Sequence, residues 1–279
     1  MSDIVVTGLN IYPVKSLRGI SLQEAVLTTQ GLQHDRRWMV VRESGKFVTQ
    51  RDISTLALIE THLEEDGVVL SRDGFGSKQL LFSHRAGAAI SSKVWKDEVE
   101  TTDEGDEVAA WLTAATQSKH PLRMVRMAAG FTRQHSAAGR FGAENATVFA
   151  DASPYLLANQ QSLEALNVEL QARGHAAVPM NRFRANIVVS GMAAFSEHQT
   201  GSLGNEHYAF GLRDACERCV VPTIDQETAE RNPQHEPFKT LTDINPMPNA
   251  KAPAFAENSI LLHGAGQLVR VGDKLQVQA

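Results

Sequence analysis

The two cysteines of the chain stand close together in the segment Cys216-Glu217-Arg218-Cys219. They are too few and too close to form a disulfide framework. A thiolate is a ligand for soft metals, and the fixed positive charge of Arg218 between the two thiols favours the thiolate form. The motif therefore predicts a reactive or metal-binding thiol.

Other interpretations of this motif need further ligands, more cysteines or a helix after the motif. A structural zinc site takes four ligands, so zinc would also need two distant histidines. A four-cysteine iron–sulfur cluster is excluded because the chain has only two cysteines. Thioredoxin-like chemistry places the motif at a helix N-terminus, whereas the β-branched residues that follow predict a strand over Cys219–Ile224. A pair of buried structural cysteines stays open as an alternative.

Three further segments place cations beside predicted strands. A lysine or arginine can bind phosphate, the former as a point charge and the latter through two parallel hydrogen bonds. Taken singly, each segment is better explained as a loop or a surface ion pair. The segments are Tyr12-Pro13-Val14-Lys15-Ser16, Asp35-Arg36-Arg37-Trp38 and Arg182-Phe183-Arg184-Ala185-Asn186.

Charge is unevenly distributed along the middle of the chain. Residues 97–107 carry seven acidic side chains, whereas residues 119–140 carry five lysines or arginines and no acid. One interpretation is a solvated acidic face beside a basic loop. The other is that the basic stretch supplies arginines to an anionic cofactor.

The elements that must position these residues are mostly short strands. Many β-rich stretches separated by glycine-containing breaks favour an α+β fold that is mostly β, with barrel-like sheets. Helical spacing of apolar residues predicts two helices, over Glu104–Ala115 and Gln160–Gln171. We find no βαβ alternation and no internal repeat.

Two features divide the chain. The polar segment after the first helix predicts a smaller β-rich N-terminal domain over residues 1–118 and a second domain over residues 119–279. The proline-rich segment 226–253 has little periodicity and predicts a long ordered loop that acts as a functional lid.

Composition limits the function classes. With 279 residues and 42% hydrophobic residues, the chain is long enough to bury a large core, and its net charge of −5 argues against nucleic acid as a partner. No apolar run reaches the ~18 residues of a membrane helix. No secretory signal is visible, so we expect a cytoplasmic location. Phosphate-binding loops, dinucleotide fingerprints, zinc-protease motifs and nucleophile elbows are all missing, which removes most hydrolase and nucleotide-binding functions.

Taken together, the cationic segments and the cysteine motif resemble the MOSC family. The similarity is to the branch that contains the mitochondrial amidoxime-reducing component and its bacterial relatives. The segments occur in the family's order, and the matches run from residue 4 to about residue 275. Val271-Gly272-Asp273 also resembles that family's closing strand. The resemblance implies an N-terminal MOSC β-barrel domain followed by the MOSC domain proper.

The resemblance also implies a molybdenum–molybdopterin cofactor whose metal takes one thiolate from the protein. That ligand is the second cysteine of the motif, Cys219, which is also the catalytic residue, while Cys216 is structural. Ser153, within Asp151-Ala152-Ser153-Pro154, matches a further cofactor contact, although Ala152 departs from the family's pattern. By the same matching, the residues that hold the pterin and its phosphate are Lys15, Ser16, Arg36, Arg184, Asn186 and Arg218.

The implied activity is the reduction of N-hydroxylated compounds, with cleavage of the N–O bond. Some bacterial relatives carry a ferredoxin-like domain with four cysteines. This chain has two cysteines in all, so we expect no iron–sulfur cluster and a separate electron-donor protein. No membrane anchor precedes residue 4, so we expect no membrane partner. Asp225 is a candidate to face the pocket, although an exposed carboxylate is the simpler interpretation.

Three other functions compete with the reductase. A sulfur carrier would hold a persulfide on Cys219 for metal–sulfur or cofactor assembly and would need few of the donors between Lys15 and Arg218. A pyridoxal-phosphate enzyme would use Lys15 as its Schiff-base lysine. A purely structural or scaffolding protein would use neither.

Overall fold

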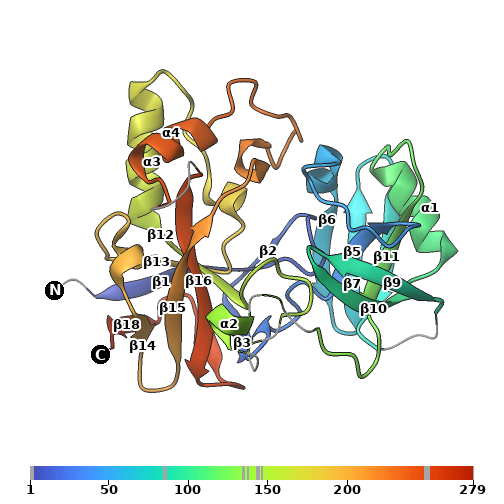
Figure 1. Cartoon of the computed structure of the whole chain (residues 1–279), viewed down its shortest axis with the longest axis horizontal. Helices are drawn as coiled ribbons and strands as arrows, with labels where there is room; N and C mark the ends of the chain where they lie inside the picture. Colours follow the sequence, from blue (N-terminus) through green and yellow to red (C-terminus); the bar gives the residue numbers. More distant parts are fainter. Residues whose placement is uncertain are drawn as a thin grey trace.

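The computed structural model describes residues 3–83, 87–133, 136, 138–142, 145, 147–247 and 252–278. Figure 1 shows two lobes, one with a large barrel under α3 and α4 and the other with α1 beside smaller sheets. Strands dominate both lobes, which confirms the α+β, mostly β fold class. Among the described residues, no helix is both long and apolar enough to cross a membrane.

A closed barrel forms the larger lobe. Its seven strands follow the order β13-β12-β16-β15-β14-β18-β1, and the pairing of β1 with β13 closes the ring, while β2 (Ile20–Leu22) extends β1 outside it. Val6, Leu9 and Ile11 of β1 are buried in the barrel core, and an irregularity between Val6 and Gly8 shifts the inward alternation by one residue. The barrel strands are β1 (Ile4–Ile11), β12 (Tyr155–Asn159), β13 (Ile187–Ser190), β14 (Ser202–Gly204), β15 (Ala209–Glu217), β16 (Ala254–His263) and β18 (Lys274–Val277).

The other lobe combines two sheets and one helix. A four-stranded sheet has the order β5-β11-β10-β9, and a three-stranded sheet has the order β6-β7-β8. The strands are β5 (Trp38–Arg42), β6 (Glu60–Glu64), β7 (Gly67–Arg72), β8 (Gly76–Leu81), β9 (Ala89–Val94), β10 (Asp97–Asp103) and β11 (Leu122–Met127), with the 3-10 helix η1 at Ser54–Leu58. A third small sheet, β17 (Leu268–Arg270), β3 (Glu24–Thr28) and β4 (Gly31–Leu32), lies beside the barrel.

Both helices predicted from apolar spacing are present. Helix α1 covers Asp106–Ala115, and its buried residues Val108, Trp111 and Leu112 pack into the core of the smaller lobe. It begins two residues later than predicted because Gly105 has φ 100°, outside the helical range. Helix α3 covers Gln160–Ala172 and is capped by Asn159, whose side chain accepts a hydrogen bond from the backbone N–H of Gln161.

Two predictions about local structure are wrong. Strand β12, helix α3 and strand β13 form a βαβ unit with parallel pairing, which was missed because β12 was not recognised as a strand. The strand predicted over Cys219–Ile224 is absent: β15 ends at Glu217, and a 3-10 helix, η5 (Val221–Thr223), follows with Pro222 in its first turn. Proline favours the start of a helix and removes a donor from a strand.

The remaining helices lie mostly in the connections of the larger lobe. The predicted long loop 226–253 contains α4 (Phe238–Ile244), and residues 248–251 lie outside the described part of the chain. The other helices are α2 (Ala138–Phe141), η3 (Met180–Phe183) and η4 (Ser196–Gln199).

Two strands belong to the lobe opposite to the one that a division between residues 118 and 119 would assign them. Strand β1 closes the barrel made otherwise of C-terminal strands, whereas β11 pairs with β5 and β10 in the smaller lobe. The chain therefore passes from one lobe to the other after β1 and again after β11. The division of the sequence into two domains at this point stays a prediction.

Candidate functional site

A cavity of about 610 Å³ collects side chains from both lobes. Its wall on the barrel side includes Asn258 of β16, which is paired with Leu156 of β12 and Asp214 of β15, and all three line the cavity. The eight residues predicted as the site also line this one cavity, although they come from five separate parts of the sequence. They are Lys15, Ser16, Arg36, Ser153, Arg184, Asn186, Arg218 and Cys219.

The two cysteines lie in different environments. Cys219 is exposed, whereas Cys216 is half-buried, and both are free thiols. Arg218 Nη1 donates to Cys216 Sγ at 3.1 Å, and Nη2 donates to the carbonyl of Phe183 at 2.9 Å. Burial raises the pKa of Cys216, and the positive charge of Arg218 opposes this shift. In the sequence Arg218 stands between two thiols that no pattern distinguishes. In the structure its guanidinium donates a hydrogen bond to Cys216, whereas Cys219 is exposed.

Three predicted residues form one hydrogen-bonded group around Tyr12. Arg36 Nη1 donates to Asn186 Oδ1 at 2.9 Å, and Arg36 Nη2 donates to the carbonyl of Arg184 at 3.3 Å. The guanidinium carbons of Arg36 and Arg184 lie 4.6 Å and 4.2 Å from the centroid of the Tyr12 ring, a cation–π distance. Asp35 fixes Arg36 through an ion pair. The site cations are thus held before any ligand binds.

Backbone conformation also distinguishes the predicted residues. Ser16, Arg36 and Arg184 have φ values of 71°, 47° and 58°, in the left-handed region that non-glycine residues rarely occupy. Each such residue carries a strain of ~1–3 kcal/mol and persists because the surrounding structure holds it. Together with Trp95 at φ 57°, four such residues line this cavity, which indicates that side-chain direction is maintained there at a cost in stability.

Lys15 anchors a second group at the other end of the cavity. Its Nζ donates to the carbonyl of Phe149 at 2.8 Å and forms an ion pair with Asp151, which also accepts from Trp95 Nε1 at 2.8 Å. Burial lowers the pKa of Lys15, and Asp151 opposes that shift. Partial desolvation raises the pKa of Asp151, but Lys15 and Trp95 outweigh it and hold the pKa well below its usual range.

Ser153 and several unpredicted residues complete the wall. The hydroxyl of Ser153 donates to the carbonyl of Tyr155 at 2.6 Å and lies 3.2 Å from Asn258 Oδ1. Arg51 stacks on Trp95, with its guanidinium carbon 4.6 Å from the ring centroid. Arg140 of the lining belongs to the basic stretch 119–140, which one interpretation of the sequence assigned to an anionic cofactor. The lining residues that sequence reasoning missed include Gln50, Arg51, Trp95, Asp151, Asp214 and Met247. They were missed because none of them belongs to a recognisable sequence motif.

The side chains fit a bound anion. The cavity lining contains six cationic side chains (Lys15, Arg36, Arg51, Arg140, Arg184 and Arg218) against three acidic ones (Asp151, Asp214 and Glu217). Burial lowers the pKa of Arg184 to about 10, and Nε of Arg218 is buried without a hydrogen-bond partner among the described residues. A polar group with phosphate and dithiolene charges would satisfy these donors, so the residues fit a molybdopterin cofactor.

Two other candidates from the sequence find less support. Asp225 is not part of the cavity lining and forms an ion pair with Arg182 at 2.6 Å. A zinc site would need further ligands beside the cysteines. Within the described ranges, no group of three or more histidine, cysteine or acidic side chains is arranged to hold a metal.

The barrel and its thiol-bearing cationic cavity define a MOSC-type protein. The MOSC N-terminal beta barrel domain matches residues 3–119, and the MOSC domain matches residues 144–276. Human mitochondrial amidoxime-reducing component 1 is 30% identical over 96% of this chain and 81% of its own length. The chain therefore belongs to the MOSC family of the amidoxime-reducing components, which confirms the resemblance and gives it a molybdenum-related function.

Other relatives and one solved structure are also similar. The molybdenum cofactor sulfurase of Drosophila willistoni is 31% identical over 87% of this chain, which spans 29% of that protein. The crystal structure of the YUAD protein from Bacillus subtilis aligns with 99% of this chain and 94% of its own, at a TM-score of 0.38 and 12% identity.

Proposed function

We propose that this protein is a molybdenum-cofactor oxidoreductase that reduces N-hydroxylated compounds. The observation that carries the proposal is the assembly of all eight predicted residues, including the exposed thiol of Cys219, around one cationic cavity. The similarity to an amidoxime-reducing component over almost the whole chain supports this substrate class. The net reaction uses two electrons and two protons, breaks the N–O bond, and yields an amidine or amine and water.

The cavity residues divide into two proposed roles. Lys15, Ser16, Arg36, Arg184, Asn186, Arg218 and Ser153 would hold the pterin and its phosphate, and Cys219 would be the protein's ligand to the metal. When bound, the cofactor supplies the two-electron chemistry of N–O cleavage. The chain's own contribution is a fixed set of donors, and the Asp35–Arg36–Asn186 contacts keep that set in place.

Asp151 is suited to orienting the substrate. Its low pKa keeps the carboxylate ionised, so it acts as a hydrogen-bond acceptor and not as an acid near neutral pH. Its side chain is 61% exposed on the cavity surface although one oxygen contacts Lys15. The N–H groups of an amidoxime are donors that this carboxylate can accept, which would place the N–O bond in a defined direction.

The matched pair Cys219→Ser and Cys216→Ser tests the proposal. Each variant is produced in a cofactor-competent host and assayed for molybdenum, for pterin after oxidative release, and for benzamidoxime reduction with reduced methyl viologen as electron donor. We expect loss of metal-centred activity in Cys219→Ser, with pterin retained through the phosphate contacts, and substantial activity in Cys216→Ser. A fully loaded wild type that does not reduce benzamidoxime would refute the reductase assignment.

We further propose that the electrons come from a separate protein in the cytoplasm. This chain has two cysteines, too few for a four-cysteine iron–sulfur cluster, which supports a donor outside it. Pull-down from a cell extract with the loaded protein as bait, followed by reconstitution of NADH- or NADPH-dependent turnover, identifies the donor.

The sulfur-carrier function has one observation in its favour. Cys219 is exposed, and a persulfide carrier needs an accessible thiol that a partner can reach. The similarity to molybdenum cofactor sulfurase is compatible with this role. Treatment with a sulfane-sulfur donor followed by mass spectrometry tests it: a persulfide on Cys219 in protein that binds neither metal nor pterin would favour the carrier over the reductase.

A further inference from the structure

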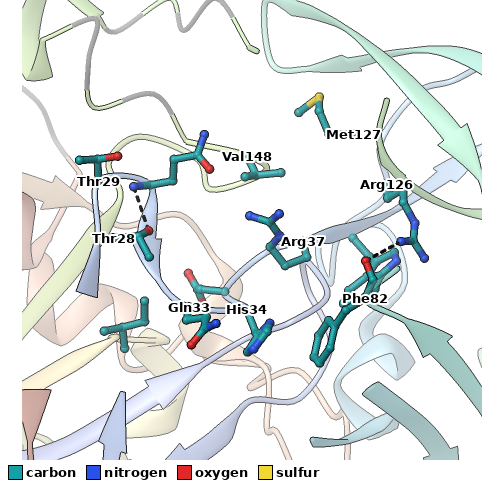
Figure 2. Close-up of a pocket in the computed structure, with 13 residues that line it drawn as sticks. Thr28, Thr29, Gln33, His34, Arg37, Phe82, Arg126, Met127 and Val148 are labelled. Carbon is teal, nitrogen blue, oxygen red and sulfur yellow. Dashed lines mark hydrogen bonds between the residues drawn. The ribbon is translucent and has the colours of Figure 1, made fainter. Parts of the chain in front are cut away.

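A second cavity lies beside the cofactor cavity but is lined by different residues. Its volume is about 410 Å³, within the range of small-molecule sites. Its lining joins the segment Thr28–Asp35 and the start of β5 to Phe82, Arg126, Met127 and Val148. Figure 2 shows Arg37 in the middle of this cavity, between Val148 on one side and Phe82 with Arg126 on the other. None of the proposed cofactor contacts is part of this lining.

The two arginines of this cavity differ in how their donors are used. Arg126 is buried and forms a two-pronged ion pair with Glu104, and it also donates to the carbonyls of Leu81 at 2.7 Å and Ser83 at 3.0 Å. Its guanidinium is therefore occupied by the protein. In contrast, no hydrogen bond or ion pair engages the guanidinium of Arg37 within the part of the chain that the structure describes.

Among the described residues that line the cavity, no acidic side chain pairs with Arg37. The acid in the lining is Asp35, whose side chain is 2% exposed and accepts hydrogen bonds from the backbone N–H of Tyr12 and from Arg36. Desolvation by the cavity wall and, secondarily, the positive charge of Arg126 lower the pKa of Arg37. The side chain remains open to solvent, so a ligand can reach it. Arg37 is thus a cation with free donors inside a concave site.

An apolar wall lies beside these free donors. The His34 and Phe82 rings stack with their centroids 4.0 Å apart and an interplanar angle of 21°. The centroid of the Trp38 ring lies 6.0 Å from that of Phe82. Met127 and Val148 add aliphatic surface. A flat apolar body can pack on such a surface while its charged group pairs with arginine. Inorganic anions would use the guanidinium alone.

From this arrangement we propose that the second cavity binds a small organic carboxylate with a flat apolar body, through an ion pair with Arg37. The site is independent of the proposed reductase activity because it uses none of the cofactor contacts. It is adjacent to the cofactor cavity because Arg36 lines one cavity and Arg37 lines the other.

Benzoate is the probe, and two methionines report which cavity it enters. Met127 lines the second cavity, whereas Met247 lines the cofactor cavity. Full-length protein labelled with [methyl-¹³C]methionine is titrated with benzoate and followed by NMR. We expect a saturable shift of the Met127 methyl signal. In Arg37→Gln the dissociation constant should rise about ten- to a hundred-fold, because one charge-assisted contact is lost.

The matched control is Arg42→Gln, which removes the same charge from β5 outside the cavity. It should bind benzoate like wild type, and Arg37→Lys should recover part of the affinity. Thermal unfolding establishes that each variant is folded. The proposal is overturned if only Met247 shifts, or if Met127 binding is unchanged in folded Arg37→Gln. It is also overturned if benzyl alcohol or inorganic phosphate binds at Met127 as tightly as benzoate.

Discussion

Replacing Arg184 with glutamine separates the requirements of the cofactor from those of the fold. Burial lowers the pKa of Arg184 from 12.5 to about 10, and Tyr12 opposes the shift while Arg36 adds to it. At about 1.4 kcal/mol for each pKa unit, the charged form is disfavoured by ~3 kcal/mol in the protein without cofactor. The hydrogen bond from Nη1 to the carbonyl of Leu17 at 2.8 Å and the stack on Tyr12 restore ~2–4 kcal/mol.

These opposing effects nearly cancel. We therefore expect Arg184→Gln to change the free energy of unfolding of the cofactor-free protein by no more than ~1 kcal/mol, measured by urea denaturation with circular dichroism. The same substitution should weaken cofactor binding about ten- to a hundred-fold, because a charge-assisted contact to an anion is lost. Released pterin per protein, measured after dialysis, reports this loss.

Arg182→Gln is the matched control, because Arg182 lies two residues earlier, outside the cavity lining, and pairs with Asp225. It should lose some stability and retain its pterin. The reasoning is refuted if Arg184→Gln retains wild-type pterin after dialysis. A loss of more than ~3 kcal/mol of stability in the cofactor-free variant would equally contradict it.

Three further predictions concern thiol reactivity, pH and packing. Iodoacetamide should modify exposed Cys219 at least about ten-fold faster than half-buried Cys216, because burial raises the pKa of the Cys216 thiol. Peptide mass spectrometry measures both rates, and equal rates would contradict the prediction. Burial also raises the pKa of Glu257 above 4.5, against the opposing effect of His198, so stability should fall as pH rises through that shifted range. In Glu257→Gln the free energy of unfolding, measured in urea between pH 4.5 and 7, should decrease less steeply with pH than in wild type. An unchanged dependence on pH would contradict this. Leu166→Ala, at a fully buried position of α3, should cost ~2–5 kcal/mol, whereas Val168→Ala, at a position 67% exposed, should cost little in the same assay.

Local sequence patterns predicted the helices and the general class of fold well. The apolar residues of α1 and α3 recur at helical spacing, and that period survives in the folded protein as one buried face on each helix. Strand β12 was missed because Tyr155–Asn159 is buried almost throughout and shows no alternation. A short apolar run of this kind does not differ from part of a buried helix by periodicity. The parallel pairing of β12 with β13 was missed for the same reason.

The candidate site could be predicted residue by residue only through the resemblance to a family. Arg36 and Arg184 stand 148 positions apart, and no local pattern connects them, yet one donates a hydrogen bond to the carbonyl of the other. Their left-handed backbone was equally invisible, since arginine has no preference for that region. Arg51, Trp95 and Asp151 were missed because their contacts join segments that are far apart in the sequence.

The cofactor cavity contains several features that cost stability in the protein without a ligand. Lys15 and Arg184 both have pKa values lowered by burial, Arg218 has a buried Nε without a partner among the described residues, and three of the site residues adopt left-handed backbone conformations. A sequence optimised for stability alone would replace such residues by neutral or apolar ones. Their combination around one exposed thiol is therefore better explained by a ligand than by folding. The same argument applies on a smaller scale to Arg37, where one cation with unused donors lies against an apolar wall.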